Sequence, residues 1–192
     1  MKKVLLSVTL LSLVACSTSS KSGPADPDFN QEDFARLVAP GEQHQMLSQL
    51  SGEWAANASF WMGGKEINSK ATMNRQVVLG GRFVQEDYRE IGGQNMNGVG
   101  LIGYDNAANK FSYTWADTMG TGVFTSLGEE IAAPAGQRAI QFTGEQVCPV
   151  SGEKASNRSV LRMISPSKQS FEVFQTGADG EEQKLLEVVY TR

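Results

Sequence analysis

Cys16 is the residue whose neighbours point most directly to a chemical modification. It closes the run Leu13-Val14-Ala15-Cys16, which ends an apolar stretch that begins after Lys2 and Lys3. A basic start, a short apolar segment and a small residue before the cut make up a cleaved export signal. Because a cysteine follows the cut, the run has the form of a lipobox. We therefore expect cleavage before Cys16 and attachment of acyl chains, such as palmitate, to that cysteine.

The apolar stretch is too short to cross a bilayer, which takes roughly 17–25 apolar residues in a helix. Acyl chains on Cys16 would instead hold the mature chain at a membrane, since each buried methylene contributes about 0.8 kcal/mol. The alternative is an ordinary secretory signal in which Cys16 falls by chance. Ser17, rather than Asp, follows Cys16, as expected of lipoproteins exported onward to the outer membrane. We expect an exported protein anchored there and facing the periplasm.

His44 is the one histidine in the chain, and this limits the chemistry available elsewhere. A lone imidazole cannot form a His-rich metal site, and no serine lies in a Gly-x-Ser-x-Gly elbow. The carboxylates show no opposed pair of the kind that acid–base catalysis uses. We expect no catalytic centre, no metal and no cofactor. His44 is expected to be packed and hydrogen-bonded; a ligand contact, or a haem or metal ligand, is the alternative.

An aromatic stripe offers the best candidate wall for a ligand. Phe111, Tyr113 and Trp115 alternate with small residues, so their rings point to one side of a strand. The same rings would also suit an ordinary core, and both interpretations remain open. Asp117, at the end of the stripe, is expected to be a hydrogen-bonding residue at the rim. Asp105 is expected to cap a turn.

Two arginines interrupt segments that otherwise resemble strands, namely Arg82 and Arg162. An inward guanidinium would need a partner and could receive the carboxylate of a fatty-acid-like ligand. The alternative is that both point outward or pair with Glu86, Glu145 or Glu172. The predicted ligand contacts are Arg82, Tyr104, Tyr113, Trp115, Asp117 and Arg162.

Charge and cysteine content exclude several kinds of partner and bond. The formal net charge is −4, and removal of Lys2 and Lys3 makes it more negative. An acidic chain without Lys/Arg clusters is not expected to bind nucleic acid. After Cys16 is lipidated only Cys148 remains, so an internal disulfide is excluded. Cys148 is expected to be a bystander thiol, with a reactive or metal-binding role as the alternative.

The first part of the mature chain is expected to be a spacer followed by short helices. Residues 17–28 are rich in Ser, Pro and Asp and cannot bury a core. Asn30 can cap a helix that runs through Ala39, and Pro40 interrupts it. A second short helix is expected from Gly41 to Leu50, because Gly52 follows as a stop signal.

From Gly52 onward the chain consists of strand-like segments separated by Gly, Asn, Asp and Pro. Several alternate with period two, which is typical of half-buried strands. The order favours consecutive hairpins, and closing them into a barrel removes exposed edges. We predict an all-β, up-and-down antiparallel barrel with one or two short N-terminal helices and about ten strands: 53–61, 67–79, 82–91, 96–104, 110–117, 121–129, 137–146, 154–164, 169–176 and 183–191.

The chain from about residue 40 to the C terminus resembles the bacterial family known as domain of unknown function 1579. The likeness is carried by Pro40 to His44, Leu47, Leu50, Gly52, Trp54, Leu79 to Phe83, Gly98, Gly100, Gly103 to Asn106, Trp115, Asp117, Gly120-Thr121, Thr143 to Glu145 and Tyr190 to Arg192. That family is grouped with the calycins, which include lipocalins and fatty-acid-binding proteins. The resemblance implies a barrel with an internal cavity and brings no established activity. Cys148-Pro149 departs from the Asp-Pro pair expected in one hairpin.

Gly52-x-Trp54 also resembles the signature at the first strand of lipocalin-type barrels. There the tryptophan plugs the closed end beneath an arginine of the last strand. By that resemblance Trp54 is the plug and Arg192 its lid, a cation–π contact worth about 0.5–2 kcal/mol. Gly52, Trp54, Arg192 and His44 are thus expected to have structural roles.

The predicted organisation is a signal peptide over residues 1–15, a lipidated cysteine with spacer and helix over 16–39, and a barrel domain over 40–192. The predicted function is that of a membrane-anchored protein whose barrel binds a small apolar or amphipathic ligand. An envelope structural or interaction protein with a filled barrel is the alternative, and an enzyme is a more distant one. The sequence identifies no protein partner.

Overall fold

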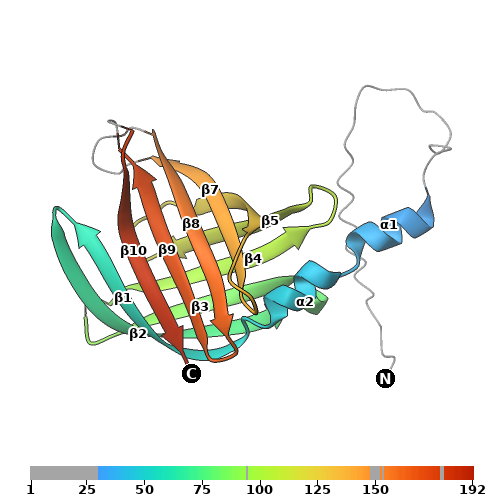
Figure 1. Cartoon of the computed structure of the whole chain (residues 1–192), viewed down its shortest axis with the longest axis horizontal. Coiled ribbons are helices and arrows are strands. Elements are labelled where there is room, and N and C mark those ends of the chain that lie inside the picture. The colour runs from blue at the N-terminus through green and yellow to red at the C-terminus, as the bar shows by residue number, and fades with distance from the viewer. Residues whose placement is uncertain (1–29, 94, 148–151, 153, 178–179) are drawn as a thin grey trace, which may run out of the picture.

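The computed structural model describes residues 30–192 except 94, 148–151, 153 and 178–179. Within these residues, strands pair in chain order and β10 pairs with β1, giving a closed antiparallel barrel (Figure 1). The predicted up-and-down barrel is confirmed. Its strands are β1 (Gly52–Met62), β2 (Lys65–Val78), β3 (Phe83–Ile91), β4 (Asn97–Asp105), β5 (Lys110–Asp117), β6 (Phe124–Ile131), β7 (Arg138–Val147), β8 (Lys154–Ser165), β9 (Lys168–Thr176) and β10 (Glu182–Thr191).

The predicted strands agree with the observed ones apart from their ends. The largest shift is in β6, which was predicted from residue 121 and begins at Phe124. Between β2 and β3 the prediction extended the strands by one residue each, to Leu79 and Arg82. The structure has a 3-10 turn there, η1 (Leu79–Gly81), with positive φ at all three residues. Two glycines in sequence adopt that conformation at no steric cost. The expected signal peptide, Cys16 and spacer, and also Cys148, lie outside the described residues.

Two short helices precede the barrel, as predicted. α1 (Gln31–Val38) is capped by Asn30, whose side chain accepts a 2.9 Å hydrogen bond from the Glu32 amide. α2 (Glu42–Ser48) follows Pro40 and lies across one end of the barrel, where it buries His44, Met46 and Leu47. No helix in the described part of the chain combines the length and the apolar character needed to cross a membrane.

The barrel has two unlike ends. The end covered by α2, where odd-numbered strands begin, is here called the base; the opposite end, where β1 turns into β2, is the rim. At the base, α2 and the strands form one continuous apolar cluster. Its members are almost inaccessible, with Leu50, Ile140 and Phe142 at 0% exposure. Burying a side chain of this size contributes about 1.5–3 kcal/mol, so the base supplies much of the stability.

Trp54 closes the base beneath Arg192. The indole is 2% exposed, and its Nε1 donates a 2.9 Å hydrogen bond to the Leu50 carbonyl. The Arg192 guanidinium lies 4.2 Å from the ring centroid and donates to the Ser51 carbonyl. Gly52 has φ +124°, and a Cβ there would lie 2.6 Å from Arg192 Nη1. A side chain at position 52 would therefore displace the Arg192 guanidinium and would also be strained by the backbone conformation.

The Trp54→Ala variant should lose about 3–5 kcal/mol of unfolding free energy, because a buried aromatic ring, its hydrogen bond and its cation–π contact all disappear. Thermal denaturation should show a fall of about 6–20 °C in Tm. Trp61→Ala is the matched control, since Trp61 is half-buried on the outer wall. Equal effects of the two substitutions would remove the special role of Trp54.

Candidate functional site

The inner wall near the rim is built from small side chains on one side of the barrel. Alternation along β1 and β2 places Ala56, Ala58 and Ala71 on the inside, each 2% exposed. β4 places Gly98 and Gly100 on the same wall. The two glycines leave room for larger side chains of the wall, Trp115 and Glu86, which lie directly against them. We call the inward-facing residues above the middle of the barrel the rim-side inner wall.

Several larger side chains of this wall are partly accessible to solvent, although its alanines are buried. Phe60, Trp115, Phe171 and Leu186 pack against the buried cluster of β1, β2 and β10, yet all four are only half-buried. Phe124 is also half-buried, and its ring packs beside that of Tyr113 with the two centroids 6.4 Å apart. Because these rings point into a closed barrel, their exposed surface faces its interior. These rings therefore leave accessible apolar surface on the inner side of the barrel near the rim.

Trp115 is held directly against the backbone of β4. A Cβ on Gly98 would lie 2.1 Å from the Trp115 ring, and one on Gly100 would lie 3.1 Å from it. The indole Nε1 donates a 2.8 Å hydrogen bond to Asp117, whose other oxygen accepts from the Met119 amide. The glycines thus permit a close approach, and Asp117 orients the ring.

Polar side chains without a protein partner lie on the opposite part of the wall. Ser126, Asn157 and Ser159 are 6%, 4% and 1% exposed, and their side-chain polar atoms make no hydrogen bond with any described residue. Asn157 pairs with Gly144 across β7 and β8, and a Cβ on Gly144 would lie 3.0 Å from Ser126 Cβ. Strands β6, β7 and β8 therefore bring these groups together. We call Ser126, Asn157 and Ser159 around Gly144 the polar notch.

The polar notch is costly for the folded state. A buried donor or acceptor left unpaired costs about 1–3 kcal/mol, and most buried polar groups in proteins have a partner. On the opposite wall the Tyr88 hydroxyl and Ser69 Oγ are also buried without a hydrogen-bond partner among the described residues. These groups are available to hydrogen-bond a molecule inside the barrel.

A buried ion pair separates the base from the rim-side inner wall. Arg75 Nε donates a 2.7 Å hydrogen bond to Glu86, and the two side chains are 1% and 3% exposed. Arg75 Nη1 donates to Gln169 at 2.5 Å, and the guanidinium lies 4.3 Å from the Tyr190 ring centroid. Together with Tyr113, these residues form what we call the polar floor: Arg75, Glu86, Tyr113, Gln169 and Tyr190.

Electrostatics within the polar floor keep its phenols neutral. Burial would lower the pKa of Arg75, but the Glu86 carboxylate outweighs burial and the pKa is raised. Burial, and after it the Glu86 charge, raise the pKa of Tyr113 well above its ordinary value. Burial also raises the pKa of Tyr190, against the opposing effect of Arg75. The floor therefore holds one cation and one anion, and these compensate each other.

The structure brings some of the predicted ligand residues together and separates others. Tyr113, Trp115 and Asp117 lie in order along the inner side of β5, from the floor to the rim. Tyr104 lies at the base instead, with edge contacts to Phe111 and His44 at 4.8 Å and 5.9 Å between centroids. His44 is 6% exposed, and its Nδ1 accepts a 3.0 Å hydrogen bond from the Gly41 amide. His44 is thus packed and hydrogen-bonded, as expected.

Neither Arg82 nor Arg162 reaches the barrel interior. Arg82 lies at the base and donates to the Val38 carbonyl at 2.7 Å, which ties α1 to the barrel. Arg162 alternates with the buried Leu161 and Met163, so it points outward. Neither arginine therefore points inward, where it could bind the carboxylate of a ligand. For Arg162 the structure shows the alternative, an outward arginine paired with Glu172 at 3.5 Å.

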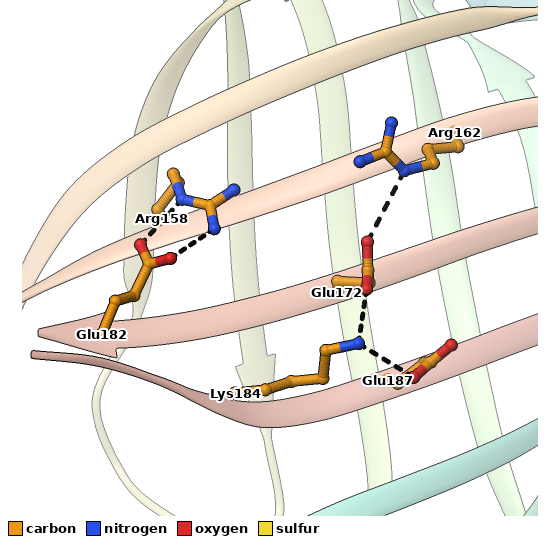
Figure 2. A network of polar contacts seen from close by, with 6 residues as sticks. All are labelled: Arg158, Arg162, Glu172, Glu182, Lys184 and Glu187. Atoms are coloured by element: carbon orange, nitrogen blue, oxygen red, sulfur yellow. Dashed lines mark hydrogen bonds and ion pairs between the residues drawn. The ribbon is translucent and has the colours of Figure 1, made fainter. Parts of the chain in front are cut away.

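Arg162 belongs to a network of ion pairs on the outer wall of β8, β9 and β10 (Figure 2). Glu172 lies between Arg162 and Lys184, and Lys184 Nζ lies 2.6 Å from Glu172 and 3.1 Å from Glu187. Burial would raise the pKa of Glu172, but Lys184 and then Arg162 outweigh it and the pKa is lowered. The network joins three neighbouring strands across their outer face.

An open depression of about 470 Å³ lies beside this network and is lined by residues of β7 to β10, with Gly144 and Asn157 among them. Its charged members include Arg158 and Glu182, which already form two hydrogen bonds with each other at 2.8 Å and 2.5 Å. Arg158 also lies over the Phe174 ring. Arg158 and Glu182 therefore neutralise each other at this depression.

Sequence reasoning did not identify the polar floor or the polar notch. Arg75 lies at the same inward parity as Ala71 and Met73, and Glu86 pairs directly with Arg75 across β2 and β3. Matching the registers of these two predicted strands could have found the pair. The notch carries no such signal, because Ser and Asn are common on either face of a strand.

Comparisons with known proteins place the chain among barrels of unknown function. The family described as "Protein of unknown function (DUF1579)" matches residues 39–192. The crystal structure of Rv2717c from M. tuberculosis is similar in fold, with a TM-score of 0.60 at 13% identity over 80% of this chain and 99% of that one. A DUF3598 family protein from Nostoc punctiforme matches 80% of this chain and 100% of its own at 8% identity and a TM-score of 0.24, which carries no argument. No curated protein matches.

Removing one partner of the buried ion pair should be far more damaging than removing both. Glu86→Gln should cost about 3–5 kcal/mol in chemical denaturation, because it leaves the Arg75 charge buried without a counter-charge. The double variant Arg75→Met/Glu86→Leu should recover most of that loss. Glu130→Gln is the control, since its pair with Arg138 is exposed and should contribute about 0–1 kcal/mol. Similar losses for Glu86→Gln and Glu130→Gln would contradict the assignment.

Proposed function

The chain belongs to the DUF1579 family of proteins of unknown function, and we propose that its barrel binds a small apolar or amphipathic ligand against the rim-side inner wall. The observation that carries this proposal is the contrast between the two ends. The base is packed to 0% exposure at several side chains, whereas half-buried aromatic rings and unpartnered polar groups line the rim. A calycin-like binding barrel agrees with this contrast.

The composition of the wall supports a ligand of this kind. Small-molecule sites are concave and mostly apolar, with a few polar groups that fix orientation. Trp115, Phe124 and Phe171 supply apolar surface, and the polar notch supplies the polar groups. No catalytic step is included in the proposal. Glu86 is paired with Arg75, and Asp117 accepts hydrogen bonds from Trp115 and Met119.

We further propose that lipid on Cys16 holds the protein at a bacterial membrane, at the outer membrane facing the periplasm. The support comes from the lipobox and its basic and apolar flanks. The described chain enters the barrel through α1, which is tied to the base by Arg82 and Asn106. An anchor on the N-terminal side would therefore join at the base and leave the rim accessible.

An interaction protein that acts through its outer wall is the second candidate. Val99 and Leu127 are 51% and 58% exposed on β4 and β6, and both alternate with inward residues. A partner that covers this side of the barrel would explain their exposure. Such a protein would need no ligand at the rim, which separates the two candidates experimentally.

Native mass spectrometry of protein purified without detergent should detect a bound small molecule. Trp115→Ala should reduce the occupied fraction at least about tenfold, because a well-packed aromatic contact is worth more than about 1.4 kcal/mol. Trp61→Ala on the outer wall should leave occupancy unchanged. An unliganded wild-type protein that also takes up no added alkyl amide, alcohol or acid would favour the interaction protein instead.

Cys16→Ser should release the protein from the membrane fraction, because the acylated thiol is lost. Cell fractionation and the intact mass of the wild-type chain measure this outcome, with Cys148→Ser as the matched cysteine control. A wild-type mass without acyl chains, or a Cys16→Ser protein that still sediments with membranes, would contradict the anchor. Neither result bears on the ligand.

A further inference from the structure

We propose that the bound molecule is uncharged and that its polar head, a hydroxyl, carbonyl or amide group, is held by the polar notch. The proposal rests on the proposed function, because it assigns a chemical class to the ligand of that barrel. It also places the head on β6, β7 and β8 and leaves the apolar part for the aromatic rings. Charge, burial and hydrogen-bonding capacity each support it.

The charges near the rim-side inner wall disfavour an anionic head. Arg75, the cation of the polar floor, is already neutralised by Glu86 at 2.7 Å. Asp117 and Glu90 add carboxylates on the same inner side of β5 and β3. A carboxylate ligand would thus meet two further anions and a cation that is already paired. A fatty-acid anion, which an inward Arg82 or Arg162 could have received, does not fit.

A cationic head is also poorly matched, because the inward carboxylates are already used. Asp117 accepts hydrogen bonds from the Trp115 indole at 2.8 Å and the Met119 amide at 2.9 Å. Glu90 accepts one from the Met96 amide at 3.0 Å. An ammonium group held at the polar notch would lose its hydration and would meet no carboxylate among the three notch side chains. Asp117 and Glu90 therefore accept hydrogen bonds from neighbouring groups of the protein itself.

The polar notch matches a neutral head in its hydrogen-bonding capacity. The Asn157 amide supplies both a donor and an acceptor, and each of the two serine hydroxyls can act as either. All three side chains are at least nine-tenths buried, so a charged head placed here would be desolvated without a counter-charge. A hydroxyl, carbonyl or amide would lose less hydration and would satisfy atoms that are otherwise unpaired.

The backbone of β7 makes the convergence possible. Gly144 separates Ser126 from Asn157, and a Cβ on Gly144 would lie 2.5 Å from the Thr125 carbonyl oxygen. Without a side chain at this position, β6 approaches β7 closely, and only Gly144 lies between Ser126 and Asn157 on the inner wall. Ser159 follows two residues after Asn157 on the same inward face of β8. The notch is therefore formed by the sheet itself, on rigid elements.

Three probes with the same alkyl chain test the class of head group near neutral pH. Dodecanamide is neutral, dodecanoate is anionic and dodecylamine is cationic, and isothermal titration calorimetry below micellar concentrations measures the affinity of each. The full-length mature protein should bind dodecanamide at least tenfold more tightly than either charged probe. Tighter or equal binding of dodecanoate or dodecylamine would overturn the neutral-head inference while supporting a binding barrel. Binding of none of the three would overturn both.

Asn157→Leu tests the notch itself. The substitution keeps the side-chain size and should weaken dodecanamide binding at least tenfold, bringing it close to that of the charged probes. Tm should stay the same or rise, because a buried amide without a partner is removed. Asn74→Leu is the matched control: Asn74 faces outward on β2, and its replacement should leave affinity unchanged.

Unchanged dodecanamide affinity in Asn157→Leu would overturn the role of the notch. A large fall in Tm with unchanged probe preference would show that Asn157 is structural only. If Asn157→Leu fails to fold, the double variant Ser126→Ala/Ser159→Ala repeats the test, because it removes two hydroxyls and adds no volume. That variant should likewise lose the preference for dodecanamide, and retention of the preference would overturn the proposal.

Discussion

The ion pair between Arg75 and Glu86 is the interaction on which the arrangement of the barrel depends. Two charges at 1% and 3% exposure are tolerated only with close pairing and further hydrogen bonds. Gln169 and the ring of Tyr190 provide additional contacts from β9 and β10. A slip of one residue in either strand would turn a charge to the outer wall and leave the other unpaired. The pair therefore constrains the register of both sides of the barrel.

The Arg75–Glu86 pair also lies between two parts of the interior that differ in how they are packed. Below it, α2, Trp54 and the base cluster are packed without accessible surface, and Arg192 covers the indole. Above it, half-buried rings and unpartnered polar groups remain. A stable base allows the rim to keep groups that reduce stability by about 1–3 kcal/mol each. The unpartnered polar groups that the structure describes on β6 and β8 are the ones on which the proposed ligand site rests.

Much of the fold was predictable because its determinants are local. Period-two alternation and the glycine and asparagine turns located the strands, and Asn30 and Pro40 located the helices. The roles of Trp54, Arg192 and Gly52 were expected from resemblance, and the structure adds the steric reason at Gly52. Which arginine is buried was harder to predict, because Arg75, Arg82 and Arg162 all interrupt strand-like segments. Only Arg75 shares the inward parity of its strand and meets a carboxylate on the next one.

The sequence by itself determined the class of fold and the order of its strands, since both depend on residues close together in the chain. The tertiary structure alone decided which polar residues meet. Arg75 and Gln169 are 94 residues apart in sequence, and Ser126 and Asn157 lie on strands separated by β7. Closure of the barrel sets these distances, and alternation within a single strand carries no information about them. Which charges are buried, and the neutral character of the notch, follow from that closure.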